Sequence, residues 1–174
     1  MKKYTVGPET ARLTHRAFEE HDAEALFALN SNPLVMQYTG ETLWASVEST
    51  RSAIRDYPDF DSVGFGRWAC VLKSTQEVIG FCGLKYLADL DAVDVGYRLL
   101  PEFWGRGIAT EACKACVEFG FRTIGLVKII GLVLPENLAS IRVLEKSNLR
   151  FEKQFTYDGE RVLQYAREGA TANG

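Results

Sequence analysis

Three strand-like runs in the middle of the chain follow one another so closely that they can pair only as an antiparallel meander. The runs are Arg67–Leu72, Val78–Leu87 and Ala92–Leu99. Turn-forming residues separate them at 74–77 and again at 89–91. Strands joined by such short turns lie antiparallel, because a parallel pair needs a crossover of a dozen or more residues. This spacing therefore determines how the first half of the sheet is built.

The second half of the chain alternates helices with strands. Apolar residues at helical spacing and one continuous apolar run indicate the element types. The predicted elements are, in order, a helix over 107–123, a strand over Lys128–Leu134, a helix from Asn137 or Leu138 to Lys146, and strands over Leu149–Tyr157 and Glu160–Ala166. The last two strands form a hairpin, because Asp158-Gly159 between them is a strong turn signal.

The segment before the meander completes a mixed α/β pattern. It predicts a strand over 11–18 and helices over 23–30 and 46–57, so the full order is β-α-α-β-β-β-α-β-α-β-β. The chain has 174 residues, of which 47% are hydrophobic and 25% charged, as in an ordinary globular protein. We expect one domain over 1–174, with its folded core at 10–168.

Charge and cysteine usage argue against several classes of function. The net charge of −3 lacks the basic excess of nucleic-acid-binding proteins. Cys70, Cys82, Cys113 and Cys116 lie in strand or helix patterns, so core packing is favoured over metal or redox use of the C-x-x-C pair. Unpaired thiols are typical of a reducing cytoplasm, and the sequence suggests neither a signal peptide nor a membrane span. We expect a cytoplasmic protein without metal, nucleic-acid or membrane partners.

A glycine-rich turn between the meander and the next helix has the composition of a phosphate site. Gly105 and Gly107 let the backbone approach a ligand closely, since neither carries a Cβ. The helix that follows offers N–H groups without internal partners, and its dipole favours an anion. Arg106 adds a cation and Thr110 a hydroxyl donor. The turn therefore predicts a pyrophosphate cradle over 105–110, with a glycine-rich helix entrance that binds nothing as the alternative.

Two other phosphate-binding motifs fit the turn poorly. A P-loop needs G-x-x-x-x-G-K-[ST], and no Lys-Ser or Lys-Thr follows a glycine in this chain. A dinucleotide fingerprint needs G-x-G-x-x-G directly after a strand. Here Thr110 replaces the third glycine, and Leu100–Trp104 stand between the strand and the turn.

Two motifs on either side of one predicted strand carry a resemblance to a known family. The first is FWGRGIATEA at Phe103–Ala112, preceded by Gly96-Tyr97, and the second is ENLASIRVLEK at Glu136–Lys146. Nearly the whole chain, in this order, resembles the GNAT superfamily of N-acetyltransferases, and most closely its ribosomal-protein N-acetyltransferase-like branch. One departure is Trp104, which stands where the general signature has Gln or Arg; Trp is usual there in this branch.

The resemblance implies a fold and an acyl-CoA site. It implies a twisted mixed sheet of about seven strands flanked by about four helices, with strands four and five parallel and splayed apart. The pantetheine arm of acetyl-CoA would lie in that V and pair with strand-four backbone, and the pyrophosphate would lie on the glycine turn. The residues expected to contact the acyl donor are Leu99, Leu100, Gly105, Arg106, Gly107, Ile108, Ala109, Thr110, Asn137 and Ser140.

Acyl transfer to an amine needs a neutral nucleophile, an oxyanion donor and a partner for the leaving thiolate. By resemblance, Ser140 of the Asn-x-x-Ser motif takes the acid role that many members give to a tyrosine, and backbone N–H groups near 97–99 hold the oxyanion. Asp94 is the candidate base, acting through water, and Glu160 is a second candidate. The structural alternatives are helix capping for Ser140 and Asn137, and solvated charges for the two carboxylates.

The predicted function is transfer of an acetyl group from acetyl-CoA to a primary amine by direct attack in a ternary complex. The acceptor is expected between 32–56 and the 156–160 hairpin, on a side where the candidate aromatic residues are Tyr38, Trp44, Tyr57, Phe60 and Trp68. A protein N-terminus and a small-molecule amine fit equally well. A homodimer is one expected state, and a non-catalytic acyl-CoA-binding regulatory module is the alternative function.

Overall fold

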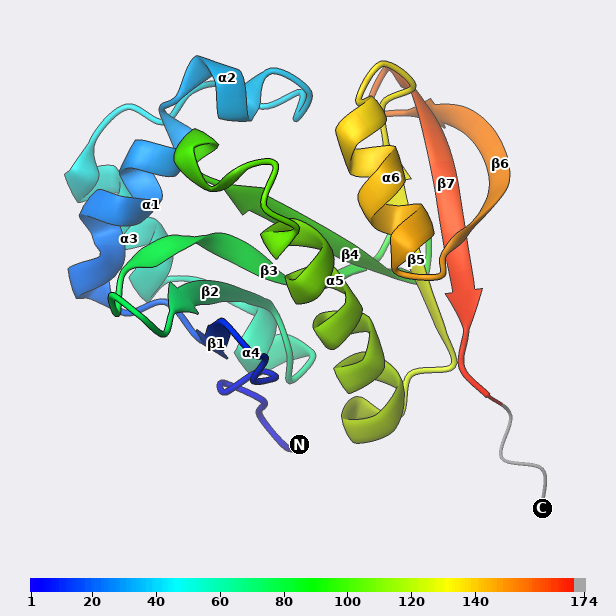
Figure 1. The fold of residues 1–174 in the computed structure, drawn as a ribbon, viewed down its shortest axis with the longest axis horizontal. Helices are drawn as coiled ribbons and strands as arrows, with labels where there is room; N and C mark the ends of the chain where they lie inside the picture. Colours follow the sequence, from blue (N-terminus) through cyan, green and yellow to red (C-terminus); the bar gives the residue numbers. More distant parts are fainter. Residues whose placement is uncertain (171–174) are drawn as a thin grey trace.

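The predicted meander forms the first half of a seven-stranded sheet in the computed structural model, which describes residues 1–170 (Figure 1). The strands are β1 (Leu13–Arg16), β2 (Arg67–Leu72), β3 (Val78–Leu87), β4 (Ala92–Leu99), β5 (Lys128–Val133), β6 (Arg150–Tyr157) and β7 (Glu160–Glu168). Their order across the sheet is β1-β2-β3-β4-β5-β7-β6. The β4–β5 pair is parallel and the other neighbours are antiparallel. The mixed sheet expected from the resemblance is therefore confirmed.

Four helices of eight or more residues match those predicted, and shorter turns of helix fill the connections. The helices are α1 (Ala23–Asn30), α2 (Pro33–Met36), α3 (Val47–Arg55), α4 (Asp59–Ser62), α5 (Ile108–Phe119) and α6 (Leu138–Lys146). Two 3-10 turns lie at Glu20–Asp22 (η1) and Pro101–Phe103 (η2), and a π turn (η3) lies at Gly120–Ile124. The sequence patterns missed α2 and α4, because four residues are too few to show a helical period. None of the helices described within residues 1–170 combines the length and the hydrophobicity that a membrane-spanning segment needs.

The main core lies between the sheet and α5. Alternate side chains of a strand point to opposite faces, so Cys82 of β3 and Leu99 of β4 point toward the same layer. Both pack with Cys113 and Cys116 of α5, and all four side chains are almost fully buried. Cys70 is also fully buried, so the core role expected for the four cysteines is confirmed.

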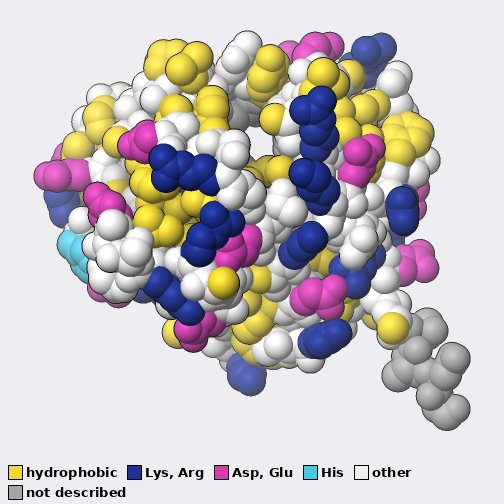
Figure 2. All heavy atoms as spheres, in the orientation of Figure 1, with side chains coloured by type: hydrophobic (Ala, Val, Ile, Leu, Met, Phe, Trp, Pro, Cys, Tyr) yellow, Lys and Arg dark blue, Asp and Glu magenta, His cyan; other side chains and the backbone are white. Residues whose placement is uncertain are grey.

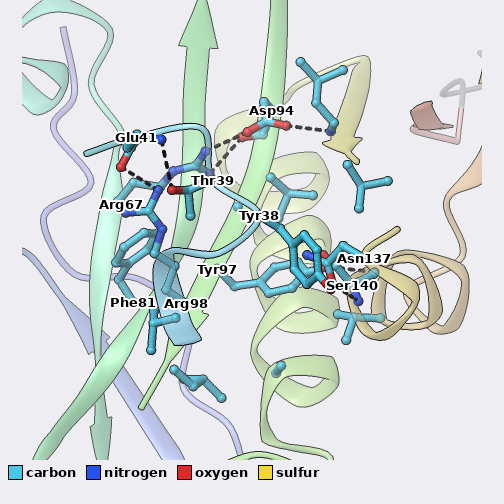
Figure 3. Close-up of a pocket in the computed structure, with 18 of the residues that line it drawn as sticks. Tyr38, Thr39, Glu41, Arg67, Phe81, Asp94, Tyr97, Arg98, Asn137 and Ser140 are labelled. Carbon is cyan, nitrogen blue, oxygen red and sulfur yellow. Dashed lines mark hydrogen bonds and ion pairs between the residues drawn. The ribbon is translucent and has the colours of Figure 1, made fainter. Parts of the chain in front are cut away.

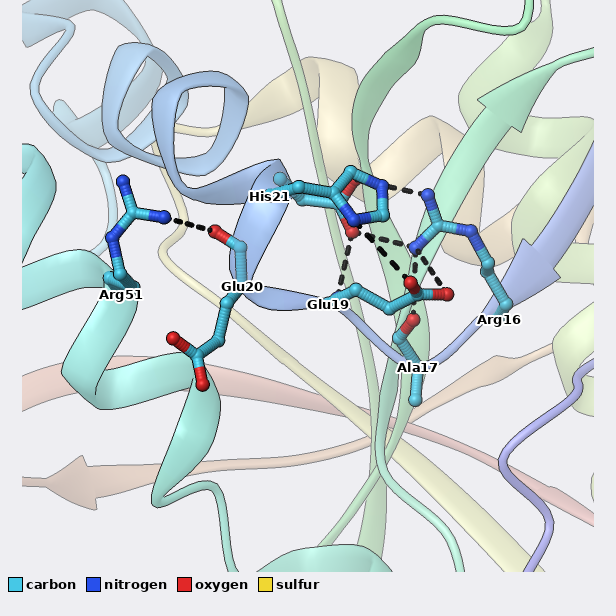
Figure 4. Close-up of polar contacts among 7 residues, drawn as sticks. Arg16, Ala17, Glu19, Glu20, His21 and Arg51 are labelled. Atoms are coloured by element: carbon cyan, nitrogen blue, oxygen red, sulfur yellow. Dashed lines mark hydrogen bonds and ion pairs between the residues drawn. The ribbon is translucent and has the colours of Figure 1, made fainter.

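A polar network fixes the chain between β1 and α1 (Figure 4). Arg16 donates to both carboxylate oxygens of Asp22, at 2.6 and 3.0 Å, and the Asp22 carboxylate also accepts from the Glu19 amide. The Asp22 side chain is only 3% exposed, so Arg16 supplies the charge that its burial requires. Arg51 of α3 donates to the carbonyl of Glu20 and ties α3 to the same turn. The network positions the helical segment that later borders the cleft.

The β4 and β5 strands meet at one point and then diverge. Their ladder consists of a single parallel pairing, Asp94 with Ile130. On its other side β5 pairs with β7 along its whole length, from Lys128–Glu168 to Val133–Leu163. Helix α6 packs over β5, where Gly131 leaves room for Leu144, since a Cβ at Gly131 would stand 2.5 Å from the leucine Cδ2. The V expected between strands four and five is thus present.

Candidate acyl-donor and acceptor cleft

A cleft of about 1230 Å³ runs through the V between β4 and β5. The β4–α5 turn and α6 border one part of it, and we call this part the donor half. The segment from α1 to α3 and the β6–β7 hairpin border the other part, which we call the acceptor half. Seen from outside, the molecular surface is hollowed between the α2 region and α6 (Figure 2). The predicted site residues can therefore be placed along one continuous cavity.

A buried ion pair stands at the point where the two strands part (Figure 3). Arg67 of β2 donates to the Asp94 carboxylate at 2.6 Å and to the Gly83 carbonyl at 2.5 Å. The second oxygen of Asp94 accepts from the backbone N–H of Leu132 on β5, at 3.1 Å. Burial raises the pKa of the Asp94 carboxyl, while Arg67 and the Leu132 amide act in the opposite direction. Asp94 thus supplies to β5 a hydrogen bond that the diverging β4 backbone no longer reaches.

Glycine on β4 makes room for this ion pair. The Arg67 side chain lies across the sheet from β2 toward β4, and a Cβ at Gly96 would stand 2.5 Å from its Nη2 atom. Any larger residue at Gly96 would therefore displace the guanidinium from Asp94. The Gly96-Tyr97 step of the sequence motif combines this clearance with a tyrosine whose side chain points to the opposite face.

Tyr97 reaches across the V to α6. Its hydroxyl lies 2.8 Å from Ser140 Oγ and 2.9 Å from the Ser140 carbonyl oxygen. Asn137 begins the helix, and its side chain accepts from the Ser140 backbone N–H at 3.1 Å. Asn137 therefore has the helix-capping role that its position suggested, while the Ser140 hydroxyl contacts β4. All three side chains line the cleft (Figure 3).

The glycine turn has an open backbone on its ligand side. Gly105 and Gly107 both adopt left-handed conformations, with φ of 71° and 74°, which favour glycine. No heavy atom lies within 4 Å of a Cβ built on Gly105, and only Arg12 Nη2, at 3.8 Å, approaches one on Gly107. Gly107 is the N-cap of α5, so the free N–H groups of the first turn begin there. This geometry is an open cradle for a phosphate group.

Arg12 ties the glycine turn to the first turn of α5. Its Nε and backbone N–H donate to the two carboxylate oxygens of Glu111, at 2.6 and 3.0 Å. Its Nη1 donates to the carbonyl of Arg106 at 2.9 Å. Burial opposes the Glu111 charge, but these bonds outweigh it and lower the pKa of the carboxyl. Sequence reasoning missed this clamp, because about 100 residues separate Arg12 from its partners and no local pattern joins them.

Two backbone groups at the end of β4 already have hydrogen-bond partners within the protein, which narrows the backbone groups available to the acyl donor. The Leu100 amide donates to the Ile79 carbonyl of β3 at 2.9 Å, and the Leu99 carbonyl accepts from the Trp104 indole at 2.7 Å. Successive residues of a strand direct their backbone groups to opposite sides. The N–H groups of Tyr97 and Leu99 are therefore the ones turned toward the V. Trp104, the departure from the general signature, closes the strand end.

The acceptor half is lined with aromatic rings and paired charges. Arg98 of β4 donates to Asn30 of α1 at 3.0 Å, forms an ion pair with Glu41 at 2.8 Å, and lies over the Phe81 ring. These contacts tie the segment after α2 to the sheet (Figure 3). Of the aromatic residues predicted for this side, those that line the cleft are Tyr38, Trp44, Tyr57 and Phe60. Trp68 is fully buried in the core instead.

Most of the predicted site residues come together in the one cleft. Those that line it are Asp94, Leu99, Gly105, Gly107, Ile108, Ala109, Thr110, Asn137, Ser140 and Glu160. Ile108 is only 3% exposed, so its backbone alone can face a ligand. Leu100 and Arg106 are not among the lining residues, and the Arg106 guanidinium lies over the Phe103 ring, 5.7 Å from its centroid. Across residues 1–170, no group of three His, Cys, Asp or Glu side chains is arranged to hold a metal ion.

Comparisons with known proteins agree on one family. A family model described as an acetyltransferase (GNAT) domain matches residues 12–150. YoaA of Bacillus subtilis, described as an uncharacterized N-acetyltransferase, is 35% identical over 154 residues, or 86% of this chain and 87% of the relative. A solved GNAT-family acetyltransferase from Bacillus anthracis has a TM-score of 0.79 at 28% identity, covering 92% of this chain and 97% of its own.

A solved structure of lower sequence identity supports the fold and nothing finer. RimL, a ribosomal L7/L12 alpha-N-protein acetyltransferase in complex with coenzyme A, has a TM-score of 0.75. Its sequence is 21% identical, and the match covers 94% of this chain and 98% of that one. At this identity the likeness supports the architecture of the sheet and helices and nothing finer.

The open cradle predicts that Gly107→Val will weaken coenzyme A binding at least about tenfold, because a side chain would fill the space of the phosphate. Gly125→Val is the matched control, since Gly125 has φ of 85° and no neighbour within 4 Å of a built Cβ. Both variants carry similar backbone strain of about 1–3 kcal/mol, but Gly125 does not line the cleft. Calorimetric titration measures both affinities, and unchanged binding by the folded Gly107 variant would contradict the cradle.

Proposed function

We propose that this chain, which belongs to the GNAT family of N-acetyltransferases and uses acetyl-CoA, passes the acetyl group directly to a primary amine held in the same cleft. The observation that carries the proposal is the pair of left-handed glycines at the entrance of α5, beside the V between β4 and β5. The donor half is thus suited to the pyrophosphate and the pantetheine arm of acetyl-CoA. The acceptor half opens onto the same ion pair and hydroxyl groups.

In the donor half, the pyrophosphate lies on residues 105–110 and accepts from the first-turn N–H groups of α5. Arg106 and the Thr110 hydroxyl add a charge and a donor. The pantetheine arm lies in the V and pairs with β4 backbone at Tyr97 and Leu99, whose N–H groups are turned that way. Asn137 borders the arm from α6.

Positive charge on the outer surface supports this placement of the phosphates. Lys and Arg side chains follow one another over α6 and α5, beside the hollow (Figure 2). Arg142 and Lys146 of α6 also line the cleft. A cluster of cations at the mouth of a cleft attracts an anionic ligand and raises its local concentration.

The reaction in the V begins with attack of a neutral amine on the thioester carbonyl. Backbone N–H groups of β4 near Tyr97–Leu99 stabilise the oxyanion that forms. Ser140 donates to the departing sulfur. Asp94 accepts the amine proton through a water molecule, since a carboxylate has about four acceptor sites and Arg67 and the Leu132 amide use two of them. Glu160, exposed at the β6–β7 hairpin, is the alternative base.

The charges of the acceptor half favour an acceptor with one ammonium group. Glu41 and Asp94 are paired with arginines inside the cleft, so neither offers a free negative charge to a polycation. Asp158 and Glu160 are exposed at the hairpin and supply negative charge at the mouth. Both a protein N-terminus and a small monoamine have this charge pattern. The ribosomal-protein branch, which would select the first, stays a prediction from the sequence motifs. A homodimer stays an expectation that rests on the resemblance to the family.

Thiol release from acetyl-CoA tests the proposed function against a panel of peptides with free N-termini, amino acids, small monoamines, aminoglycosides and spermidine. We expect turnover with a peptide or monoamine at a kcat/KM at least about tenfold above that of spermidine, because Glu41 and Asp94 are already paired with arginines. Spermidine as the best acceptor would contradict the charge argument. Silence across the panel, with coenzyme A still raising Tm, would favour the non-catalytic binding module.

The base assignment predicts different pH profiles for two matched carboxylate variants. Asp94→Asn should lower kcat by about 100-fold or more and remove the acidic limb of the pH profile, since loss of a general base typically costs that much. Glu160→Gln should keep the limb and lose less than about threefold. Tm and coenzyme A affinity, measured in parallel, separate loss of the base from loss of the Asp94–Leu132 contact. The reverse pattern would assign the base to Glu160.

A further inference from the structure

We propose that Tyr97 is a positioning residue that directs the Ser140 hydroxyl toward the departing sulfur, so that two hydroxyl groups from opposite sides of the V act as a unit. The inference rests on the proposed acetyl transfer and names a device for its last step. It starts from a contact that sequence patterns did not show, between residues 43 positions apart on β4 and α6.

The geometry places both hydroxyl groups at the cleft. The Tyr97 oxygen lies 2.8 Å from Ser140 Oγ and 2.9 Å from the Ser140 carbonyl oxygen (Figure 3). Ser140 itself is held by Asn137, which accepts from its backbone N–H. Tyr97 and Ser140 are both half-buried and line the cleft, so a ligand in the V can meet them. Two elements thus fix one serine from two directions.

The single hydroxyl hydrogen of Tyr97 can point to the Ser140 carbonyl oxygen or to Ser140 Oγ, but not fully to both. The two hydroxyl groups therefore have two possible hydrogen-bond arrangements. When Tyr97 donates to the Ser140 carbonyl, the serine hydroxyl can donate back to the phenol oxygen, and its hydrogen is not free for a ligand. When Tyr97 donates to Ser140 Oγ instead, the serine hydrogen is free and points away from the phenol. The second arrangement is the one that serves a leaving group in the cleft.

The environment keeps Tyr97 in its donor form. Burial raises the pKa of the Tyr97 phenol well above its ordinary value. The phenol therefore stays protonated at neutral pH and donates hydrogen bonds. A hydrogen bond received by Ser140 Oγ polarises the serine O–H and strengthens the bond that this group donates in turn.

The chemical step follows with its charges balanced. When the tetrahedral intermediate collapses, the carbon–sulfur bond breaks and its electron pair goes to sulfur. Ser140 Oγ–H donates to the thiolate, and Tyr97 O–H donates to Ser140 Oγ. Neither hydroxyl gives up its proton, because a serine is a far weaker acid than a thiol. The amine proton goes to the base, and the thiolate takes a proton from water on release.

A double-mutant cycle tests whether the two hydroxyl groups act as a unit. We expect Tyr97→Phe to lower kcat about tenfold, the usual cost of a hydrogen bond that supports a charge, with acetyl-CoA affinity changed less than about threefold. Ser140→Ala should lower kcat at least as much. The combined variant should be no slower than Ser140→Ala alone, since Tyr97 acts only through the serine.

Tyr165→Phe is the matched control for a merely structural role. Tyr165 lies on β7 outside the cleft lining, and burial together with the nearby Glu145 of α6 raises the pKa of its phenol, so its side chain also lies between a strand and α6. It should change Tm as Tyr97→Phe does and leave kcat within about twofold. If Tyr97→Phe fails to fold, replacement of Tyr97 by 3-fluorotyrosine provides the test, because it keeps the ring and the hydroxyl group. This replacement should change kcat in the protein that has Ser140 and leave kcat unchanged in the Ser140→Ala variant.

The outcomes separate this inference from the proposed function. A wild-type protein without turnover on any acceptor would contradict the acetyl transfer itself. If the wild-type protein turns over, but Tyr97→Phe lowers kcat as much in the Ser140→Ala background as in the wild type, the two hydroxyl groups act independently. That result would overturn this inference and leave the proposed acetyl transfer intact. An equal kcat loss in Tyr165→Phe would also overturn it, because anchoring of α6 would then explain the effect.

Discussion

The ion pair between Arg67 and Asp94 is the interaction on which the cleft depends. Through it, β2 supplies the guanidinium, β3 the Gly83 carbonyl, β4 the carboxylate and β5 the Leu132 N–H, so one buried contact joins four strands where the sheet divides. Removal of one partner of a buried ion pair typically costs about 3–5 kcal/mol, because the other charge remains unpaired. The sheet can open into a V without leaving polar groups unsatisfied because a side chain replaces the lost ladder bond.

The other parts of the site are arranged around this division. On the face toward α5, Tyr97 crosses the V to Ser140, and the strand leads through Trp104 into the glycine turn. On the opposite face, Arg98 binds the segment after α2 and borders the acceptor half. Adjacent residues of one strand thus serve the donor half and the acceptor half in turn. Because β4 and β5 diverge from one pairing, they form the two walls of a cleft, and the Asp94 contact holds these walls together where the strands part.

Local signals in the sequence predicted the elements and the donor half. The meander, the glycine turn and the cap of α6 at Asn137 each depend on a few neighbouring residues, and all three are found. The contacts that hold the site were missed because they join distant positions. Arg12 with Glu111 and Tyr97 with Ser140 arise only when the chain is folded, and Arg67 gave no local pattern at all. Asp94 was predicted as a base, and the sequence could not show that its carboxylate also bridges two strands.

Acetyl-CoA is proposed to lie in the V with its pyrophosphate on the glycine turn. Amide hydrogen exchange of the wild-type protein, with and without saturating acetyl-CoA, tests it most directly. Binding in this position should slow exchange at residues 105–110 and at Tyr97 and Leu99, with β6 unchanged as an internal reference. Unchanged exchange in these two segments under saturation, or protection confined to other strands, would contradict this placement of acetyl-CoA.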